Sequence, residues 1–260
     1  MTVSVAQAQL FLLAFTRLMA MLVPVPVLGG RSIPPQVRIG LGLLLTAVLL
    51  PWQPLPPDAP SLPALALGLA LGRELLVGTL AGFAAALTFG TLQTAGELMG
   101  LGGGFGAGRV LNPTFENSGS AFDQLFLMTA MLLFFVLDGH HLFLLAAQKS
   151  FAALPLNSPL PAAWLADPAA GAHGLLRLTA DLIVVGVLLA LPVVGASLMA
   201  DLALGLLARV APQVQVFFLG APLKVGLSLL TLSLALALLL PTVGDLLRLM
   251  GPRLLGLLGA

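Results

Sequence analysis

Residues 175–207 read LLRLTADLIVVGVLLALPVVGASLMADLALGLL, an apolar run with only three charged side chains. A helix needs roughly 20 apolar residues to cross a bilayer, so this run predicts a membrane-length helix. Pro192 within it predicts a kink. Turn residues follow at 211–213, and a second apolar run extends from Val214 to Leu240. Together the two runs predict a C-terminal helical hairpin.

The apolar character of the hairpin extends over the whole chain. Its 260 residues are 59% hydrophobic and 8% charged, with a mean hydropathy of +1.08. A soluble domain is about 25% charged, so these side chains cannot cover a water-facing surface. The composition therefore predicts an all-α, polytopic helical membrane protein, and it argues against a soluble enzyme.

Charge and cysteine content bear on further classes of function. The eleven Lys and Arg are scattered singly and the net charge is +1, so no patch for nucleic acid is expected. The chain has no Cys, which excludes disulfides and Cys metal sites. The three histidines, His140, His141 and His173, are too few and too poorly spaced to predict a metal site. No cofactor is expected.

Two helices are expected before residue 53. The first runs from about Gln7 to Leu28 and carries Arg17. It is longer than the apolar part of a signal peptide and lacks a basic segment before it, so it is interpreted as a retained helix. The second apolar run, Ile39 to Trp52, is short enough to be tilted or to cross only part of the membrane.

The middle of the chain contains three further apolar runs. Residues 63–99 form one long helix or two pieces joined at Arg73-Glu74, with Ser61 as a plausible N-cap. A helix is expected from Ala121 to about Leu137. After a break at residues 138–141, the apolar run resumes to Leu154. A Pro-rich loop at 155–168 leads to the C-terminal hairpin, whose short tail carries Arg248 and Arg253.

Pairs of glycines four residues apart recur between residues 63 and 100. Small residues at this spacing let helix backbones approach closely in a membrane. The pairs serve either close packing within the chain or packing against other subunits. They are Gly68 and Gly72, Gly78 and Gly82, and Gly96 and Gly100.

A glycine-rich stretch follows, GLGGGFGAG at residues 100–108, with Arg109 and Asn112-Pro113 after it. Such a run is not expected to hold a helix, and its unpaired backbone groups cannot face lipid. It is either a loop in solvent or a segment buried in protein or lining a wet cavity. Phe105 and Phe115 favour burial, because a solvated linker does not need bulky apolar groups.

Two other function classes remain open on the residues alone. An intramembrane enzyme is not favoured, because a His-Glu-x-x-His motif is absent and the acid–His corner at Asp138, His140 and His141 sits at a helix break. A secondary transporter of a small solute would use intramembrane charges such as Lys224, Asp181 and Asp201. No convincing repeat relates the two halves of the chain.

Five segments, in order from about residue 10 to residue 240, resemble the FliR/SctT/SpaR family of type III export-gate subunits. They are the Arg17 helix with residues 31–34 and 38–40; Arg73-Glu74 with Gly78 and Gly82-Phe83; residues 93–97 with Gly100 to Phe105; residues 137–140 with Ser150-Phe151 and Leu154-Pro155; and residues 204–213 with Val216-Phe217 and residues 222–224. The Asp-Gly-His segment looks more like the flagellar branch than the virulence branch. The chain departs from the family at Asp201 and Gln215, where Asn is common.

The resemblance implies a channel-forming subunit of the flagellar protein-export gate, in the bacterial inner membrane at the flagellar basal body. One such chain would assemble with copies of two smaller sister membrane proteins in a hetero-oligomeric core. A switch protein would wrap the channel entrance, a cytoplasmic export ring and ATPase would deliver unfolded flagellar proteins, and no nucleic acid would bind. Residues 1–172 would resemble the larger sister protein and residues 173–260 the smaller.

The resemblance, with the backbone argument above, predicts that residues 100–120 plug the closed channel at its lumen. The expected plug residues are Gly102, Gly103, Gly104, Phe105, Gly106, Arg109, Asn112, Pro113 and Phe115. A second set is expected to make packing or polar contacts between helices or subunits. It comprises Arg73, Glu74, Gly78, Gly82, Gln93, Glu97, Asp138, His140, Arg209 and Lys224.

Overall fold

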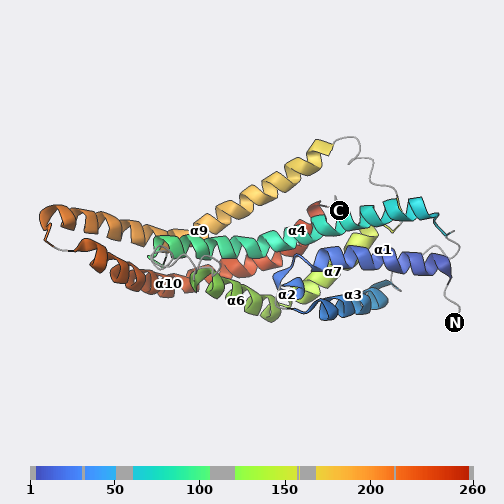
Figure 1. Cartoon of the computed structure of the whole chain (residues 1–260), viewed down its shortest axis with the longest axis horizontal. Helices are drawn as coiled ribbons and strands as arrows, with labels where there is room; N and C mark the ends of the chain where they lie inside the picture. Colours follow the sequence, from blue (N-terminus) through green and yellow to red (C-terminus); the bar gives the residue numbers. More distant parts are fainter. Residues whose placement is uncertain are drawn as a thin grey trace. The chain divides into compact units, whose positions relative to one another are not determined.

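A computed structural model of the chain describes residues 4–30, 33–50, 61–105, 121–156, 158, 168–213 and 215–257. Over these ranges the secondary structure is helical and contains no strand. The helices are α1 (Val5–Leu22), α2 (Pro26–Gly29), α3 (Pro35–Leu49), α4 (Ala64–Gly102), α6 (Ala121–Val136), α7 (Gly139–Ala153), α9 (Pro168–Val210), α10 (Val216–Arg248) and α11 (Met250–Leu257) (Figure 1). The all-α prediction is confirmed.

The chain folds into two compact units, each assembled from separated stretches of sequence. Unit 1 comprises Met1–Thr88, Asp138–Thr179 and Arg248–Ala260, and unit 2 comprises Phe89–Leu137 and Ala180–Leu247. This division follows contacts in space and does not test the expected resemblance of residues 1–172 and 173–260 to two sister proteins. That expectation stays a prediction.

Unit 1 is built around α1, which packs against α3 (Figure 1). A capping box starts α1: the Ser4 hydroxyl accepts from the Gln7 N–H, and the Gln7 side chain accepts from the Ser4 N–H. The helix ends at Leu22, just before Pro24, and α2 begins at Pro26, so the expected single helix to Leu28 is interrupted at its prolines. Near the C-terminus, helix α11 packs against α7 within the same unit.

Unit 2 contains the C-terminal part of α4, α6, most of α9 and almost all of α10. The rings of Phe89 and Phe134 meet edge to face at 5.6 Å between centroids and join α4 to α6. Elsewhere along the same two helices, a methyl group built on Gly96 would lie 2.6 Å from the backbone nitrogen of Asp123, so α4 and α6 approach backbone to backbone. Helices α9 and α10 form the expected hairpin around the turn at 212–213 (Figure 1).

Several boundaries differ from the expectations. Helix α4 is continuous, with no join at Arg73-Glu74. Its N-cap position is Pro63, whose carbonyl accepts from the Leu67 N–H, so Ser61 is not the cap. Helix α10 continues past Leu240 to residue 248, because Pro241 is accommodated inside it. The expected tail is largely the helix α11, which finds an apolar partner in α7.

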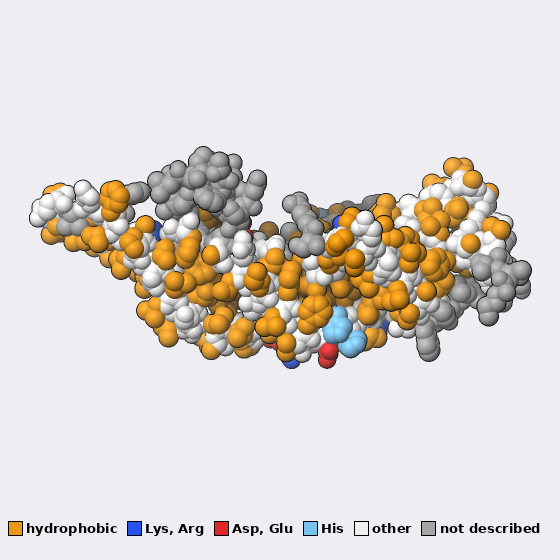
Figure 2. All heavy atoms as spheres, turned by 60° about the horizontal axis from the view of Figure 1, so that its bottom comes forward, with side chains coloured by type: hydrophobic (Ala, Val, Ile, Leu, Met, Phe, Trp, Pro, Cys, Tyr) orange, Lys and Arg blue, Asp and Glu red, His pale blue; other side chains and the backbone are white. Residues whose placement is uncertain are grey.

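The apolar surface of the helices identifies a membrane protein. Four helices in the described ranges are long and apolar enough to cross a membrane, and a fifth span exists if the broken pair α6 and α7 counts as one. Large hydrophobic side chains remain exposed along them, such as Leu234 and Leu238 at 73% and 78%. Figure 2 shows hydrophobic side chains over much of one face, with few charges among them. The prediction of a polytopic membrane protein is confirmed.

Candidate functional site

The glycine-rich stretch begins inside a helix. Helix α4 extends through residue 102, and only residues 103–105 form a turn, so the expectation that residues 100–108 hold no helix is wrong at its start. The N–H of Gly103 still donates to the carbonyl of Met99, at 2.7 Å. Glycine lowers helix propensity by only about 1 kcal/mol, and tertiary packing outweighs this.

That packing is against α10. A methyl group on Gly103 would lie 2.6 Å from the Ser228 hydroxyl, closer than real side chains approach. Gly104 has a φ of +85°, a left-handed backbone that glycine adopts without strain, and its own methyl group would lie 3.2 Å from Cβ of Lys224. The turn at residues 103–105 is therefore fitted to the surface of α10.

Phe105 at the end of this turn lies against α6. Its ring meets the buried Phe122 ring edge to face, with centroids 4.9 Å apart. Four of the expected plug residues, Gly102 to Phe105, are thus placed in unit 2. The other five lie outside the described residues, namely Gly106, Arg109, Asn112, Pro113 and Phe115.

A polar pair crosses the α9–α10 hairpin beside the turn. Lys224 Nζ lies 2.5 Å from Oδ1 of Asp201, and one helical turn further into the hairpin the hydroxyls of Ser197 and Ser228 lie 3.3 Å apart. Sequence analysis missed the two serines. The sequence signal that could have identified them is their spacing, because each serine lies four residues from a member of the ion pair and therefore on the same helix face.

The same region is hollowed. A cavity of about 460 Å³ lies between the start of α10, the end of α9 and the end of α4. Lys224 and Asp201 line it together with small or apolar residues, among them Gly104, Gly205 and Gly220. Glycines that lack side chains here widen the space next to the ion pair.

Unit 1 holds a second charged group, the Arg-Glu cluster of Arg17, Arg73 and Glu74. Arg17 and Glu74 are fully buried, with Arg17 Nε 2.5 Å from Glu74 Oε2, and Arg73 Nη1 lies 3.0 Å from the other carboxylate oxygen. The Arg17 guanidinium also donates to the Ser150 carbonyl at 2.9 Å and lies over the Phe151 ring. The cluster therefore ties α1, α4 and α7 together.

Arg73 extends the Arg-Glu cluster to the chain that follows α7. Its guanidinium donates to the Pro155 carbonyl at 3.3 Å and to the Ser158 hydroxyl at 3.0 Å. A charge buried in an apolar medium is costly unless it is paired and hydrogen-bonded. Arg73 and Glu74 thus make polar contacts between elements of one unit.

The glycine pairs differ in their surroundings. A methyl group on Gly78 would lie 2.7 Å from Cβ of Ala20, and one on Gly82 would lie 2.7 Å from the carbonyl oxygen of Met21, so this pair permits contact between α4 and α1. Gly68 and Gly72 have no atom of the chain within 4 Å of such a group. Of the two explanations left open, packing within the chain holds for Gly78 and Gly82.

Three further residues of the packing set are exposed on their helices: Gln93 and Glu97 on α4, and Arg209 at the end of α9. Arg209 lies in the last turn, where a cation interacts favourably with the helix dipole. The role of these residues in subunit packing stays a prediction.

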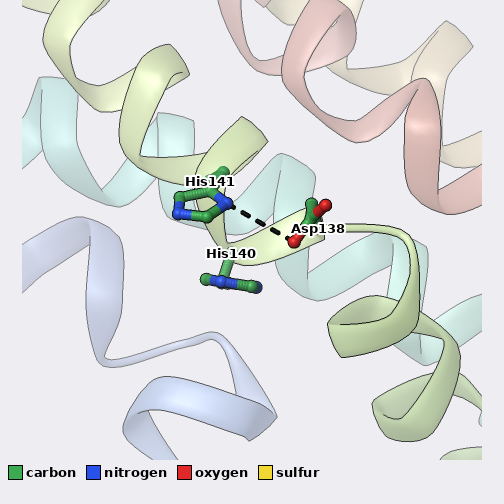
Figure 3. A group of neighbouring side chains, drawn as sticks. All are labelled: Asp138, His140 and His141. Carbon is green, nitrogen blue, oxygen red and sulfur yellow. Dashed lines mark ion pairs between the residues drawn. The ribbon is translucent and has the colours of Figure 1, made fainter.

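The helix break between α6 and α7 brings together Asp138, His140 and His141, here named the Asp-His cluster (Figure 3). His141 Nδ1 lies 3.4 Å from Asp138 Oδ1, and the two imidazole rings are 4.3 Å apart between centroids. One ligand atom from each residue lies within 4.8 Å of the others. The sequence-based objection that these histidines are poorly spaced for a metal therefore does not hold for this cluster.

Comparisons with known proteins agree on one family. The model of the family described as "Bacterial export proteins, family 1" matches residues 8–250. The chain is 34% identical to the flagellar biosynthetic protein FliR of Pectobacterium carotovorum, over 89% of this chain and 85% of the relative. It is 35% identical to FliR of Caulobacter vibrioides, over 86% and 87%. The secretion system apparatus protein SsaT of Salmonella typhimurium is 35% identical to this chain, over 64% of this chain and 62% of the relative.

Proposed function

The chain belongs to family 1 of the bacterial export proteins, and on that premise we propose that it is a subunit of a type III protein-export gate. Flagellar biosynthetic proteins match 86% and 89% of this chain, and a secretion system apparatus protein matches 64% of it. The flagellar relatives and the apolar helices support a place in the bacterial inner membrane. The observation that carries the proposal is the family match over residues 8–250.

The exported substrates are unfolded flagellar proteins, and the partners are two sister membrane proteins, a switch protein and a cytoplasmic export ring. The length of the helices supports assembly with partners. Helix α4 has 39 residues and thus extends about 58 Å, roughly twice the 30 Å hydrocarbon core of a bilayer. Part of its apolar surface therefore requires protein neighbours instead of lipid.

Complementation tests the export function. In a flagellated bacterium that lacks its own copy of this subunit, expression of the chain should restore secretion of filament protein and swimming. Secretion is measured by immunoblotting the culture medium. A chain that reaches the membrane and binds the host's gate proteins but restores no secretion would contradict the proposal.

At finer scale, the plug segment at residues 100–120 closes the resting channel. Its support in the described residues is the turn at 103–105, which is fitted to α10 through Gly103 and Gly104 and to α6 through Phe105. An apolar side chain such as Phe at a constriction opposes the passage of water and ions, as hydrophobic gates do. Glycines around it would let the segment fold aside when a substrate passes.

Ion leak tests the plug. Deleting residues 102–112 should raise the permeability of the inner membrane to ions. The leak is measured as depolarisation of the membrane, reported by a voltage-sensitive dye in cells that express the assembled gate. Gly103→Val should raise the leak as well, because its side chain would collide with Ser228. The matched control is Gly68→Val, where nothing lies within 4 Å. Unchanged leak in a fully assembled gate would exclude the plug.

The alternative, a solute transporter that uses Lys224, Asp201 and Asp181, has partial support in geometry. Lys224 and Asp201 line a cavity and pair with each other. Asp181 lies twenty residues before Asp201 on α9, roughly 30 Å along the helix axis. A single small solute cannot contact all three groups, so the export function is preferred.

A further inference from the structure

The Asp-His cluster lies at the surface of unit 1, where the side chains of Asp138 and His141 are exposed. The side chains of Asp138 and His141 are 70% and 67% exposed, and His140 is half-buried beside them. Figure 3 shows the three side chains grouped around the start of α7. We propose that this cluster binds a divalent transition-metal ion of the zinc type.

The geometry of the three groups supports one ion. Two ligands held about 2.0–2.1 Å from a tetrahedral zinc ion lie roughly 3.3 Å from each other. The observed distance between Asp138 Oδ1 and His141 Nδ1 is 3.4 Å, and the third ligand atom, on His140, lies within 4.8 Å of both. On this proposal His140 supplies the third ligand to the same ion.

The ligand types select the class of metal. Two imidazoles and one carboxylate suit Zn²⁺, Co²⁺, Ni²⁺ or Cu²⁺, whereas Mg²⁺ and Ca²⁺ prefer sites made of oxygen ligands only. Three protein ligands leave a position for water or for a ligand from another chain. The ion would be held between the helix break and the first turn of α7.

The carboxylate of Asp138 does not cap helix α7. Asp138 is the N-cap residue of α7, where an aspartate normally accepts a hydrogen bond from the backbone N–H two or three residues on. Here its φ is +54° and its side chain makes no such bond. The carboxylate is directed instead toward His141. It is therefore available to a metal without loss of a cap.

Metal titration of the full chain tests the site. The protein is purified in detergent through a tag without histidines and titrated with Co²⁺, whose visible absorption reports imidazole and carboxylate ligands. Zn²⁺ should then displace Co²⁺ and abolish the absorption. We expect the native chain to bind roughly one ion and to lose it to a chelator.

Variants with neutral polar side chains of similar size identify which residues bind the metal. Asp138→Asn and His141→Gln change exposed side chains and should preserve the helical circular dichroism. Loss even of an outer-shell partner weakens metal binding about 10- to 100-fold, so loss of a ligand should weaken it at least as much. His173→Gln, an exposed histidine on α9 outside the cluster, is the control and should bind as the native chain does. Absence of Co²⁺ absorption in the native chain, or equal binding by His141→Gln, would overturn the proposal.

Discussion

Arg17 and Glu74 lie 57 positions apart in the chain and meet inside unit 1, where neither side chain reaches the surface. A charge at each of these positions is costly alone, and the pair is tolerated because each carries further partners: the Ser150 carbonyl for Arg17 and Arg73 for Glu74. Single charges on otherwise apolar helices thus mark places where helices meet.

Glu74→Gln tests the Arg-Glu cluster. The change leaves the Arg17 guanidinium buried without its counter-charge, and removing one partner of a buried pair costs about 3–5 kcal/mol. We expect a marked fall in the melting temperature of the detergent-solubilised chain, followed by circular dichroism. Asp181→Asn, which changes an exposed carboxylate on α9, is the control and should change stability little. Equal melting of both variants would show that the buried pair does not stabilise the unit.

At the scale of the helices, sequence identified most elements because long apolar runs and prolines or polar breaks are local signals. Helix α6 ends one residue before the expected Leu137, whereas α9 begins at Pro168, seven residues before the expected start at residue 175. The sequence-based predictions were wrong where tertiary packing determines the structure. The end of α4 persists through Gly102 because Gly103 fits against Ser228, and α11 is a helix because it packs on α7.

The candidate sites also combine features that the sequence predicts with contacts that only the fold determines. Lys224 is among the residues expected from the sequence to make a polar contact, and the structure provides Asp201 as its partner. The identity of that partner, and the approach of His141 to Asp138, depend on how the backbone turns at residues 211–213 and 137–138. Local patterns do not determine such distances, so the serine pair at 197 and 228 was missed.

The glycine pairs allow a test at this scale. Gly78→Leu should prevent α4 from contacting α1, because its side chain would enter the space occupied by Ala20 and the Arg17 backbone. We expect loss of monodisperse protein in size-exclusion chromatography. Gly68→Leu should leave the isolated chain intact, since nothing lies within 4 Å of that position. If Gly78→Leu elutes as the native chain does, the close approach of the two helices is not required for folding.

For the whole molecule, the exposed apolar residues pose the question of what covers them. The chain contains no Cys, so single cysteines introduced on α10 report their neighbours without interference. On the proposed function, Leu238→Cys, at a position 78% exposed within the chain, should cross-link to a sister gate protein in native membranes. The product is detected by immunoblot after mild oxidation of cells with a matching cysteine in the partner.

The control is a cysteine at the fully buried Leu13, which should not cross-link. If Leu238→Cys instead reacts only with a lipid-soluble thiol reagent, and no partner cysteine captures it, this face of α10 contacts lipid. The assignment of that surface to subunit packing would then fail.

The Arg-Glu cluster also bears on how the protein is made. The ribosome completes α1 before the partners of Arg17 exist, because Glu74 follows 57 residues later and Ser150 follows 133 residues later. At about 5–20 residues per second, the carboxylate is synthesised roughly 3–11 s after the arginine. An unpaired arginine at the centre of a lipid-embedded helix costs about 2.5–3.5 kcal/mol at the translocon. Until α4 is synthesised, the apolar residues of α1 alone must offset the cost of its unpaired arginine, and Glu74 removes that cost when it pairs with Arg17.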